Sequence, residues 1–260
     1  MAKILIIADD LTGAADCGVA FAGCGTEAFV LLGGPGSRSP DLKWKGSAGM
    51  LAIDADTRWL APELAAESVA RLVRSYCGSK DEPCLLFKKV DSTMRGNVGA
   101  ELAAGLEAMR ACASFSTRLP MLFAPAFPAQ GRTTVNGMQM ANGRPLEQAG
   151  LGRGEGAPCG DLDALLEEAG LSCGLIDIPT IRAGAGVLEV AMQRIANKVD
   201  AVICDAETED DLRAIAQAGM ALGPNLVWAG SAGLARHLAN AIGLEGIRSA
   251  APSLKWIRAP

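Results

Sequence analysis

The feature that most constrains the fold is a short apolar run that ends at two adjacent aspartates. Residues 4–8 (ILIIA) show no alternation of polar and apolar residues, which is typical of a strand buried on both faces of a sheet. The run stops at Asp9 and Asp10, and residues 14–22 have helical character, with Thr12 as the predicted N-cap. The alternative is that one of the two aspartates caps the helix and the other is solvated. A strand, an acidic turn and a helix make the first half of a βα unit, and ligands bind at such turns in open α/β sheets.

The same alternation of apolar runs and helical segments continues along the chain. Further strands are predicted at residues 27–32, 50–53, 85–90, 120–124, 174–178, 201–204 and 225–229. Helices are predicted at residues 62–76, 98–113, 162–169, 184–197, 207–221 and from about 232 to 241. Asn142-Gly143 lies between extended flanks and predicts a small β-hairpin flap within residues 135–146. These patterns predict an α/β fold, a three-layer, doubly wound and largely parallel sheet with a small β-hairpin flap.

The chain of 260 residues is long enough for one large α/β domain. We expect this domain to occupy residues 1–241 and residues 242–260 to form a linker or tail. Two further connections stand out by composition: residues 33–49 are rich in Gly, Ser and Pro, and residues 150–160 are rich in Gly.

Charge and composition exclude several classes of protein. The net charge of −5 argues against a nucleic-acid or anionic-membrane partner. The eight cysteines form no C-x-x-C motif, and the single histidine, His237, has no Cys/His cluster beside it, so no metal site is predicted. The apolar run at the N-terminus is too short for a signal peptide, and no stretch is long enough to span a bilayer. We therefore expect a cytoplasmic protein.

Charged residues follow the predicted strands closely and would meet at one edge of a parallel sheet. They are Asp9, Asp10, Asp54, Asp56, Arg58, Lys89, Asp91, Arg95 and Arg132. Arg can grip a carboxylate with two hydrogen bonds, and an Asp next to a hydroxyl can act as a general base, so this mixture suits a small polyhydroxylated acid. Taken singly, Asp91 could equally be a helix N-cap, and Lys89 and Arg95 could be solvated charges. As a set they favour a binding site.

Two common nucleotide motifs are absent from the chain in their proper context. No G-x-x-x-x-G-K-[ST] sequence occurs, and residues 23–28 (GCGTEA) follow a helix instead of a strand, the reverse of the dinucleotide-binding arrangement. Residues 230–233 (GSAG) stand at a predicted helix start and could seat a phosphate through backbone N–H groups and the Ser231 hydroxyl. A tight strand–helix turn is the alternative reading of this short motif.

Four segments together resemble the four-carbon acid sugar kinase family. They are residues 8–16 (ADDLTGAAD), 88–96 (KKVDSTMRG), 125–134 (PAFPAQGRTT) and 230–235 (GSAGLA), which occur in the family's order and cover most of the chain. The resemblance implies ATP-dependent phosphorylation of threonate, erythronate or a 3-oxo-tetronate on its terminal hydroxyl. It also implies an N-terminal domain that binds the sugar acid and a C-terminal domain that supplies most of the ATP site.

The resemblance also implies roles for individual residues. Asp10, Asp91 and Arg95 would line the sugar-acid pocket, and Asp91 or Asp10 would be the catalytic base. Ser231, between Gly230 and Gly233, would reach ATP, with Mg²⁺ neutralising the transferred phosphoryl group. The chain stops about where the family's second domain should begin, so we expect it to bind the acid but to phosphorylate it poorly alone. The expected partners are the sugar acid, ATP held by the missing domain, and a second copy of the chain in a homodimer.

Two other functions do not fit the residues of this chain, and a third remains as an alternative. A phosphorylation-controlled receiver domain would need a Lys after the fifth strand, where this chain has residues 125–128 (PAFP), and it would be about half as long. A D-x-D-x-T phosphatase does not match the spacing of Asp9, Asp10 and Thr12. The alternative that we retain is a non-catalytic sugar-acid-binding or regulatory module, which would share the pocket and never meet an ATP domain.

Overall fold

The computed structural model describes residues 3–32, 49–77, 84–112, 119–150, 159–244 and 254–258. The connection expected at 33–49 and the Gly-rich segment expected at 150–160 lie almost wholly outside these residues.

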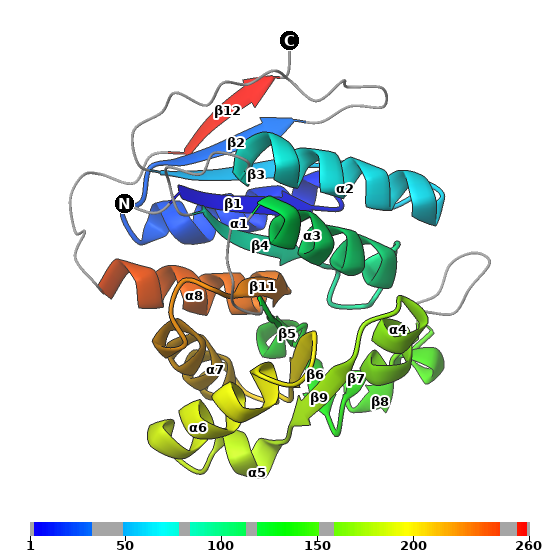
Figure 1. Ribbon diagram of the computed structural model, residues 1–260, viewed down its shortest axis with the longest axis vertical. Helices are drawn as coiled ribbons and strands as arrows, with labels where there is room; N and C mark the ends of the chain where they lie inside the picture. The colour runs from blue at the N-terminus through cyan, green and yellow to red at the C-terminus, as the bar shows by residue number, and fades with distance from the viewer. Residues whose placement is uncertain are drawn as a thin grey trace.

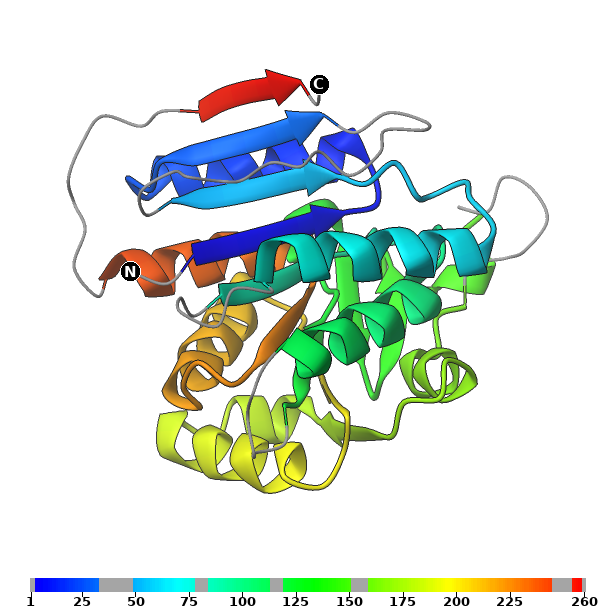
Figure 2. The same cartoon turned by 45° about the horizontal axis from the view of Figure 1, so that its top comes forward.

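The described strands of the main sheet are all parallel and confirm the predicted class of fold (Figure 1). They lie in the order β12-β2-β3-β1-β4-β11-β5-β10-β9. Figure 2 shows β12, β2, β3 and β1 side by side and pointing the same way. In chain order, their bounds are β1 (Lys3–Ala8), β2 (Ala28–Leu32), β3 (Met50–Asp54), β4 (Cys84–Lys89), β5 (Met121–Ala124), β9 (Cys173–Ile176), β10 (Ala201–Cys204), β11 (Val227–Gly230) and β12 (Leu254–Arg258).

Helices cover both faces of this sheet, as the unalternating strands predict. One core cluster packs beneath α1 (Leu11–Gly23), α6 (Ala185–Ala196), α7 (Glu209–Ala221) and α8 (Ala232–Leu244), and the other beneath α2 (Pro62–Cys77), α3 (Val98–Cys112) and α4 (Leu162–Glu168). Strand β1 contributes to both, with Ile6 in the first cluster and Leu5 and Ile7 in the second. Side chains that alternate between two buried faces explain why this strand is apolar throughout.

The predicted flap is a three-stranded antiparallel sheet of β6 (Arg132–Val135), β7 (Met138–Ala141) and β8 (Arg144–Pro145). It follows the short helix η1 (Pro128–Gln130) and precedes η2 (Leu146–Gln148). The turn at Asn142-Gly143 is confirmed, with positive φ at both residues, and Asn136-Gly137 makes a second turn of the same kind. The carboxylate of Asp205 accepts hydrogen bonds from the N–H groups of Asn136 (2.7 Å) and Gly137 (2.9 Å), which fastens the flap to the end of β10.

Three local features differ from the sequence prediction. The N-cap of α1 is Asp10 and not Thr12, because Oδ1 of Asp10 accepts the N–H of Gly13 at 2.8 Å. The strand predicted at 174–178 ends at Ile176, and the short helix α5 (Ile178–Ile181) follows it with Asp177 as N-cap. Residues 254–258, within the predicted tail, pair with β2 as the edge strand β12.

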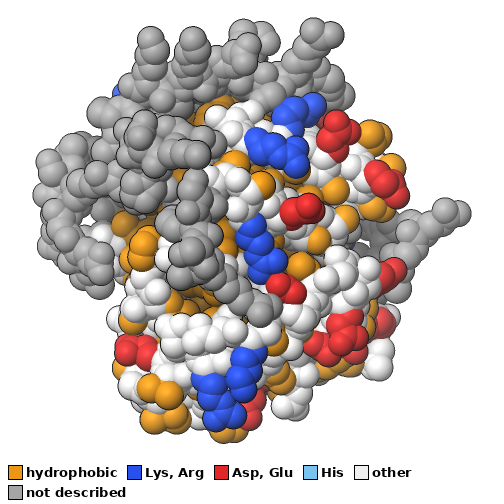
Figure 3. Space-filling view, viewed as in Figure 1, with side chains coloured by type: hydrophobic (Ala, Val, Ile, Leu, Met, Phe, Trp, Pro, Cys, Tyr) orange, Lys and Arg blue, Asp and Glu red, His pale blue; other side chains and the backbone are white. Residues whose placement is uncertain are grey.

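The surface carries charges of both signs. Figure 3 shows acidic and basic side chains of the described residues interspersed on one face of the molecule. Among the helices that the structure describes, none combines the length and the apolar character needed to cross a bilayer.

The order of the strands creates a switch point at β1, and this is where ligand binding is expected. From β1 the chain passes through β2 and β3 on one side, and it then returns to place β4 on the other side of β1. In open parallel sheets the crevice beyond the carboxyl ends of the strands at such a switch point is where ligands bind.

Candidate functional site

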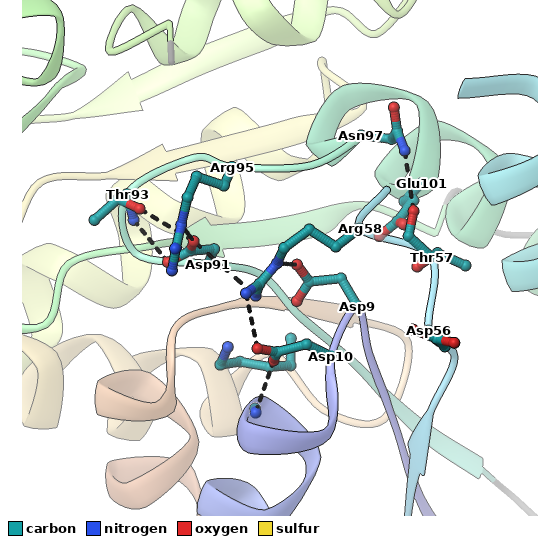
Figure 4. Close-up of polar contacts among 12 residues, drawn as sticks. Asp9, Asp10, Asp56, Thr57, Arg58, Asp91, Thr93, Arg95, Asn97 and Glu101 are labelled. Atoms are coloured by element: carbon teal, nitrogen blue, oxygen red, sulfur yellow. Dashed lines mark hydrogen bonds and ion pairs between the residues drawn. The ribbon is translucent and has the colours of Figure 1, made fainter. Parts of the chain in front are cut away.

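The predicted charged residues that follow β1, β3 and β4 meet at this switch point. Asp9 and Asp10 follow β1, Arg58 lies in the loop after β3, and Asp91 and Arg95 lie in the loop after β4 (Figure 4). The parallel register of the three strands brings their carboxyl ends together, because Ala8 of β1 pairs with the last residues of both neighbours.

Arg58 is the cation at the centre of this cluster. Its Nε lies 2.7 Å from Oδ2 of Asp9, Nη1 lies 2.8 Å from Oδ2 of Asp10, and Nη2 lies 4.0 Å from Oδ2 of Asp91. Burial by itself would lower the pKa of the Arg58 guanidinium, but the hydrogen bond to Asp9 and the charges of the three aspartates outweigh it and raise that pKa. Arg58 therefore holds three carboxylates that would otherwise repel one another, and its donors are largely taken up in doing so.

The three carboxylates differ in how far a ligand can reach them. The side chain of Asp10 is 28% exposed, whereas those of Asp9 and Asp91 are 4% and 9% exposed. Oδ1 of Asp9 is buried and has no hydrogen-bond partner among the described residues. Asp10 is thus the carboxylate of the cluster that faces outward.

Asp91 is held by its own loop. Its carboxylate accepts hydrogen bonds from the N–H of Thr93 (3.1 Å), the hydroxyl of Thr93 (3.0 Å) and Nε of Arg95. Burial would raise the pKa of Asp91, but the bonds to Arg95 and Thr93 and the charges of both arginines lower it overall. Met94 and Gly96 both have positive φ, which turns the chain back toward α3. Arg95 remains 47% exposed, so its guanidinium can still meet a ligand.

Lys89 lies at the end of β4, beside this cluster. It is 6% exposed, and within the part of the chain that the structure describes its Nζ has no ion-pair or hydrogen-bond partner. A Cβ atom added to Gly13 would lie 2.7 Å from Nζ of Lys89 and 2.9 Å from Oδ1 of Asp10, so the two charged groups share the N-terminus of α1. A nearly buried ammonium group without a partner is costly, and an anionic ligand would relieve that cost.

The neighbouring Lys88 points to the other face of the sheet and has a structural role. Its Nζ lies 2.7 Å from Oε2 of Glu101 on α3 and also donates to the carbonyl oxygen of Lys89 at 2.9 Å. Both side chains of the ion pair are only 2% exposed. The pair joins β4 to the helical layer above it.

Asp54 ends β3 close to the cluster. Burial, together with the charges of Asp56, Asp10 and Asp9, raises the pKa of Asp54 to about 6, although the N–H of Asp56 opposes the shift. Asp56 itself has positive φ and lies apart from the contacts of Arg58 in Figure 4. The structure therefore places Asp54 near the site, and the described part of the chain shows no ion pair between Asp54 and Arg58.

Two amide side chains that the sequence analysis missed hold the loops in place. Nδ2 of Asn97 donates to the carbonyl oxygens of Thr57 (3.1 Å) and Leu60 (2.9 Å), which ties the loop after β4 to the loop that carries Arg58 (Figure 4). Nε2 of Gln139, on the flap, donates to the carbonyl oxygen of Ser92 at 2.8 Å. Asn97 lies in the loop after β4 and Gln139 lies on the flap, but no sequence pattern shows that an amide side chain reaches the backbone carbonyl groups of another loop.

Two further predicted sites show no hydrogen bond or ion pair to the charged side chains among the described residues, although Gly230 of β11 pairs with Lys89 of β4 and so lies beside the cluster. Ser231 is fully buried, donates to the carbonyl oxygen of Ala126 at 2.5 Å and accepts the N–H of Gly233 at 3.0 Å. A Cβ atom at Gly230 would lie 2.4 Å from the carbonyl oxygen of Ala124, so close packing explains that glycine. Arg132 begins β6, and the described residues show no contact between it and the cluster.

The arrangement as a whole can bind a small anion that carries hydroxyl groups. Lys89 and the exposed part of Arg95 offer positive charge, and Asp10 offers a reachable carboxylate that can accept hydrogen bonds from hydroxyls. Within the described residues, no cluster of three or more His, Cys, Asp or Glu side chains has the arrangement that holds a metal ion.

Comparison with known proteins identifies the family. The family model described as the sugar-binding N-terminal domain matches residues 4–238. The chain belongs to this family. The family resemblance seen in the sequence motifs is thereby confirmed.

Relatives and a solved structure agree with this family. A D-threonate kinase of Cupriavidus necator is 41% identical over 93% of this chain and 55% of the relative. A D-erythronate kinase of Heliobacterium modesticaldum is 34% identical over 87% of this chain and 50% of that relative. A domain of unknown function from Bordetella bronchiseptica, solved with bound citrate as a domain-swapped dimer, has a TM-score of 0.73 and 29% identity, over 93% of this chain and 57% of that one. The chain spans about half the length of the curated relatives it matches.

Proposed function

We propose that this chain is the sugar-acid-binding half of an ATP-dependent kinase that phosphorylates threonate, erythronate or a 3-oxo-tetronate on its terminal hydroxyl. The observation that carries the proposal is the position of Lys89 at the switch point of the sheet, beside the outward-facing carboxylate of Asp10. Lys89 is nearly buried there and has no ion-pair or hydrogen-bond partner in the described part of the chain. The names of the relatives, D-threonate kinase and D-erythronate kinase, supply the class of acid and the reaction.

The charges of the site suggest how a four-carbon acid would lie. Its carboxylate would take Lys89 and Arg95 as partners, and its hydroxyl groups would donate to the aspartates. We assign the role of general base to Asp10, because its side chain is 28% exposed, whereas that of Asp91 is 9% exposed, is engaged by Arg95 and Thr93 and has a lowered pKa. In this assignment Asp10 accepts the proton of the hydroxyl that is phosphorylated, and Arg58 keeps its carboxylate in place.

The nucleotide is assigned to the part of the relatives that this chain does not match. The described residues offer no metal-binding cluster, and the hydroxyl of Ser231 is fully buried and bonded to protein on both sides. The Ser231 hydroxyl is therefore already satisfied within the protein. An ATP contact at Gly230, Ser231 and Gly233 stays a prediction that rests on the family resemblance.

Calorimetric titration with D-threonate, D-erythronate and a 3-oxo-tetronate, with and without Mg-ATP, tests the proposal. We expect one acid to bind, with little or no phosphorylation by this chain alone. Fusion of the chain to the C-terminal half of the Cupriavidus necator kinase should then give phosphorylation of the acid that binds. Absence of binding by every acid would contradict the proposed ligand, and binding without transfer in the fusion would favour the non-catalytic module.

We also include a homodimer in the proposal, because the Bordetella bronchiseptica relative is a domain-swapped dimer. Sedimentation velocity at micromolar concentration should show a species of twice the mass of the chain. A single species at the mass of one chain would remove this part of the proposal.

A further inference from the structure

Three cysteines lie together at the end of the sheet opposite to the proposed sugar-acid site. Cys77 is the last residue of α2, Cys84 is the first residue of β4, and Cys112 is the last residue of α3. Strand β4 runs from Cys84 to Lys89, so its whole length separates these thiols from the charged cluster.

Two of these cysteines are placed for reaction with each other. The sulfur atoms of Cys77 and Cys84 lie 2.7 Å apart, and the Cys77 thiol donates to the sulfur of Cys84. Both cysteines are free, Cys77 is buried and Cys84 is partly exposed. A disulfide brings its sulfur atoms to about 2.0 Å, so very little movement separates this pair from a bond.

The thiol of Cys112 takes no part in the hydrogen bond between Cys77 and Cys84. The hydrogen bond to Cys84, followed by burial, raises the pKa of Cys77, so this thiol is protonated at neutral pH. Partial burial also raises the pKa of Cys112, although the charge of Arg74 opposes the shift. The described structure shows no hydrogen bond from Cys112 to either of the other thiols, which makes Cys77 the nearest partner of Cys84.

We infer that Cys77 and Cys84 form a reversible disulfide when the protein meets a peroxide. The partly exposed Cys84 reacts first: its thiolate attacks one oxygen of hydrogen peroxide, becomes a sulfenic acid and releases hydroxide, which takes up a proton to form water. The sulfur of Cys77 then attacks the sulfur of that sulfenic acid, the S–O bond breaks, and the thiol proton leaves with the hydroxyl group as a second water. The two thiols lose two electrons in all, and the peroxide gains them.

The bond would join the end of α2 to the start of β4, with six residues of the sequence between the two cysteines. Closing a loop restricts the unfolded chain more than the folded one, so the oxidised protein should be the more stable form. Because the thiols lie at the far end of β4 from Lys89, the affinity for a sugar acid should stay the same.

Peptide mapping after oxidation of the native protein tests the inference. The protein is treated with hydrogen peroxide, unfolded, alkylated and cleaved with trypsin, which cuts between the two cysteines at Lys80. We expect peptides 75–80 and 81–88 to appear as one linked species, lighter than their sum by two hydrogen atoms and separated by dithiothreitol. The peptide of residues 111–118, which contains Cys112, should remain alkylated.

Variants give the second readout. The wild type should gain roughly 5 °C in Tm on oxidation, and Cys77→Ser and Cys84→Ser should gain nothing. The matched control is Cys159→Ser, because Cys159 is exposed and lies in another part of the chain, and this variant should keep the full gain. Alkylation of both Cys77 and Cys84 after oxidation, or a principal link from Cys84 to Cys112, would overturn the inference.

Discussion

At the scale of single residues, the site separates charges that hold the protein together from charges that are free for a ligand. Arg58 contacts Asp9, Asp10 and Asp91, and its role is to hold these carboxylates in place. Lys89 has no such partner in the described chain, and Arg95 is half exposed. The sequence predicts that all of these residues bind substrate. The contacts in the structure separate Arg58, which positions the aspartates, from Lys89 and Arg95, which are candidates for binding the ligand.

The first prediction concerns Lys89 and Arg95, the two cations proposed to meet the carboxylate of the ligand. Lys89→Met and Arg95→Ala should each weaken sugar-acid binding by more than tenfold, since a charge-assisted contact contributes about 2 kcal/mol. Lys89→Met should leave the Tm unchanged or raise it, because it removes a nearly buried charge without a partner. Titration calorimetry measures the affinity, and Lys198→Met, on an exposed lysine after α6, is the matched control. Unchanged affinity in either variant would remove that residue from the pocket.

The second prediction concerns the pH dependence caused by Asp54. Its pKa is raised from 3.8 to about 6 in the folded protein, so the folded state binds the proton more tightly than the unfolded state does. The stability from this group is therefore fully present below about pH 4 and is lost as the pH rises through about 6. Asp54→Asn should increase the free energy of unfolding at pH 7 by up to about 3 kcal/mol and have little effect at pH 4.

Urea unfolding at several pH values between 4 and 7 checks this second prediction. Asp163→Asn, on an exposed aspartate of α4, is the control and should follow the wild-type curve. If the free energies of unfolding of Asp54→Asn and the wild type differed by the same amount at every pH in this range, burial would not be raising the pKa of Asp54.

At the scale of elements, helix α1 offers a test of how closely the site is packed. Gly13 and Gly23 lie in the same helix, but a Cβ atom at Gly13 would lie 2.7 Å from Nζ of Lys89, whereas a Cβ atom at Gly23 would have no neighbour within 4 Å. Alanine favours a helix over glycine by roughly 0.5–1 kcal/mol, so both substitutions carry the same intrinsic gain.

The third prediction follows from this difference. Gly13→Ala should displace the ammonium group of Lys89 and reduce sugar-acid affinity severalfold, while Gly23→Ala should keep the affinity and raise the Tm slightly. Titration and thermal unfolding of the two variants together separate the effect on the site from the effect on the helix. Equal affinities in the two variants would show that the position of Lys89 does not matter for binding.

At the scale of the whole molecule, the sequence predicts the sheet better than it predicts the contacts between loops. Runs such as residues 4–8 are apolar on both faces, and the repeated βα order leaves few arrangements other than a parallel sheet with two helical layers. The meeting of Asp10, Arg58 and Asp91 follows from that sheet, because each lies just beyond a strand.

The features that the sequence analysis missed depend on contacts between distant segments. Strand β12 forms by pairing with β2 at the edge of the sheet, and the five residues 254–258 (LKWIR) do not by themselves reveal that partner. Asn97 and Gln139 hold loops through backbone carbonyl groups, which any residue could provide. The sequence does not show that Lys88 is structural and Lys89 is a candidate ligand-binding residue, because this difference depends on the ion pair between Lys88 and Glu101 of α3.

The last prediction tests whether this buried ion pair holds the layers together. Glu101→Ala would leave the ammonium group of Lys88 uncompensated in the core, and it should lower the free energy of unfolding by about 3–5 kcal/mol. The double variant Lys88→Met/Glu101→Leu should recover most of that loss, because apolar side chains of similar size remove both charges. Arg213→Ala, which breaks the exposed pair with Asp210, should cost less than about 1 kcal/mol and serves as the control in urea unfolding. A double variant as unstable as the single one would mean that Lys88 stabilises the end of β4 mainly through its hydrogen bond to the carbonyl oxygen of Lys89.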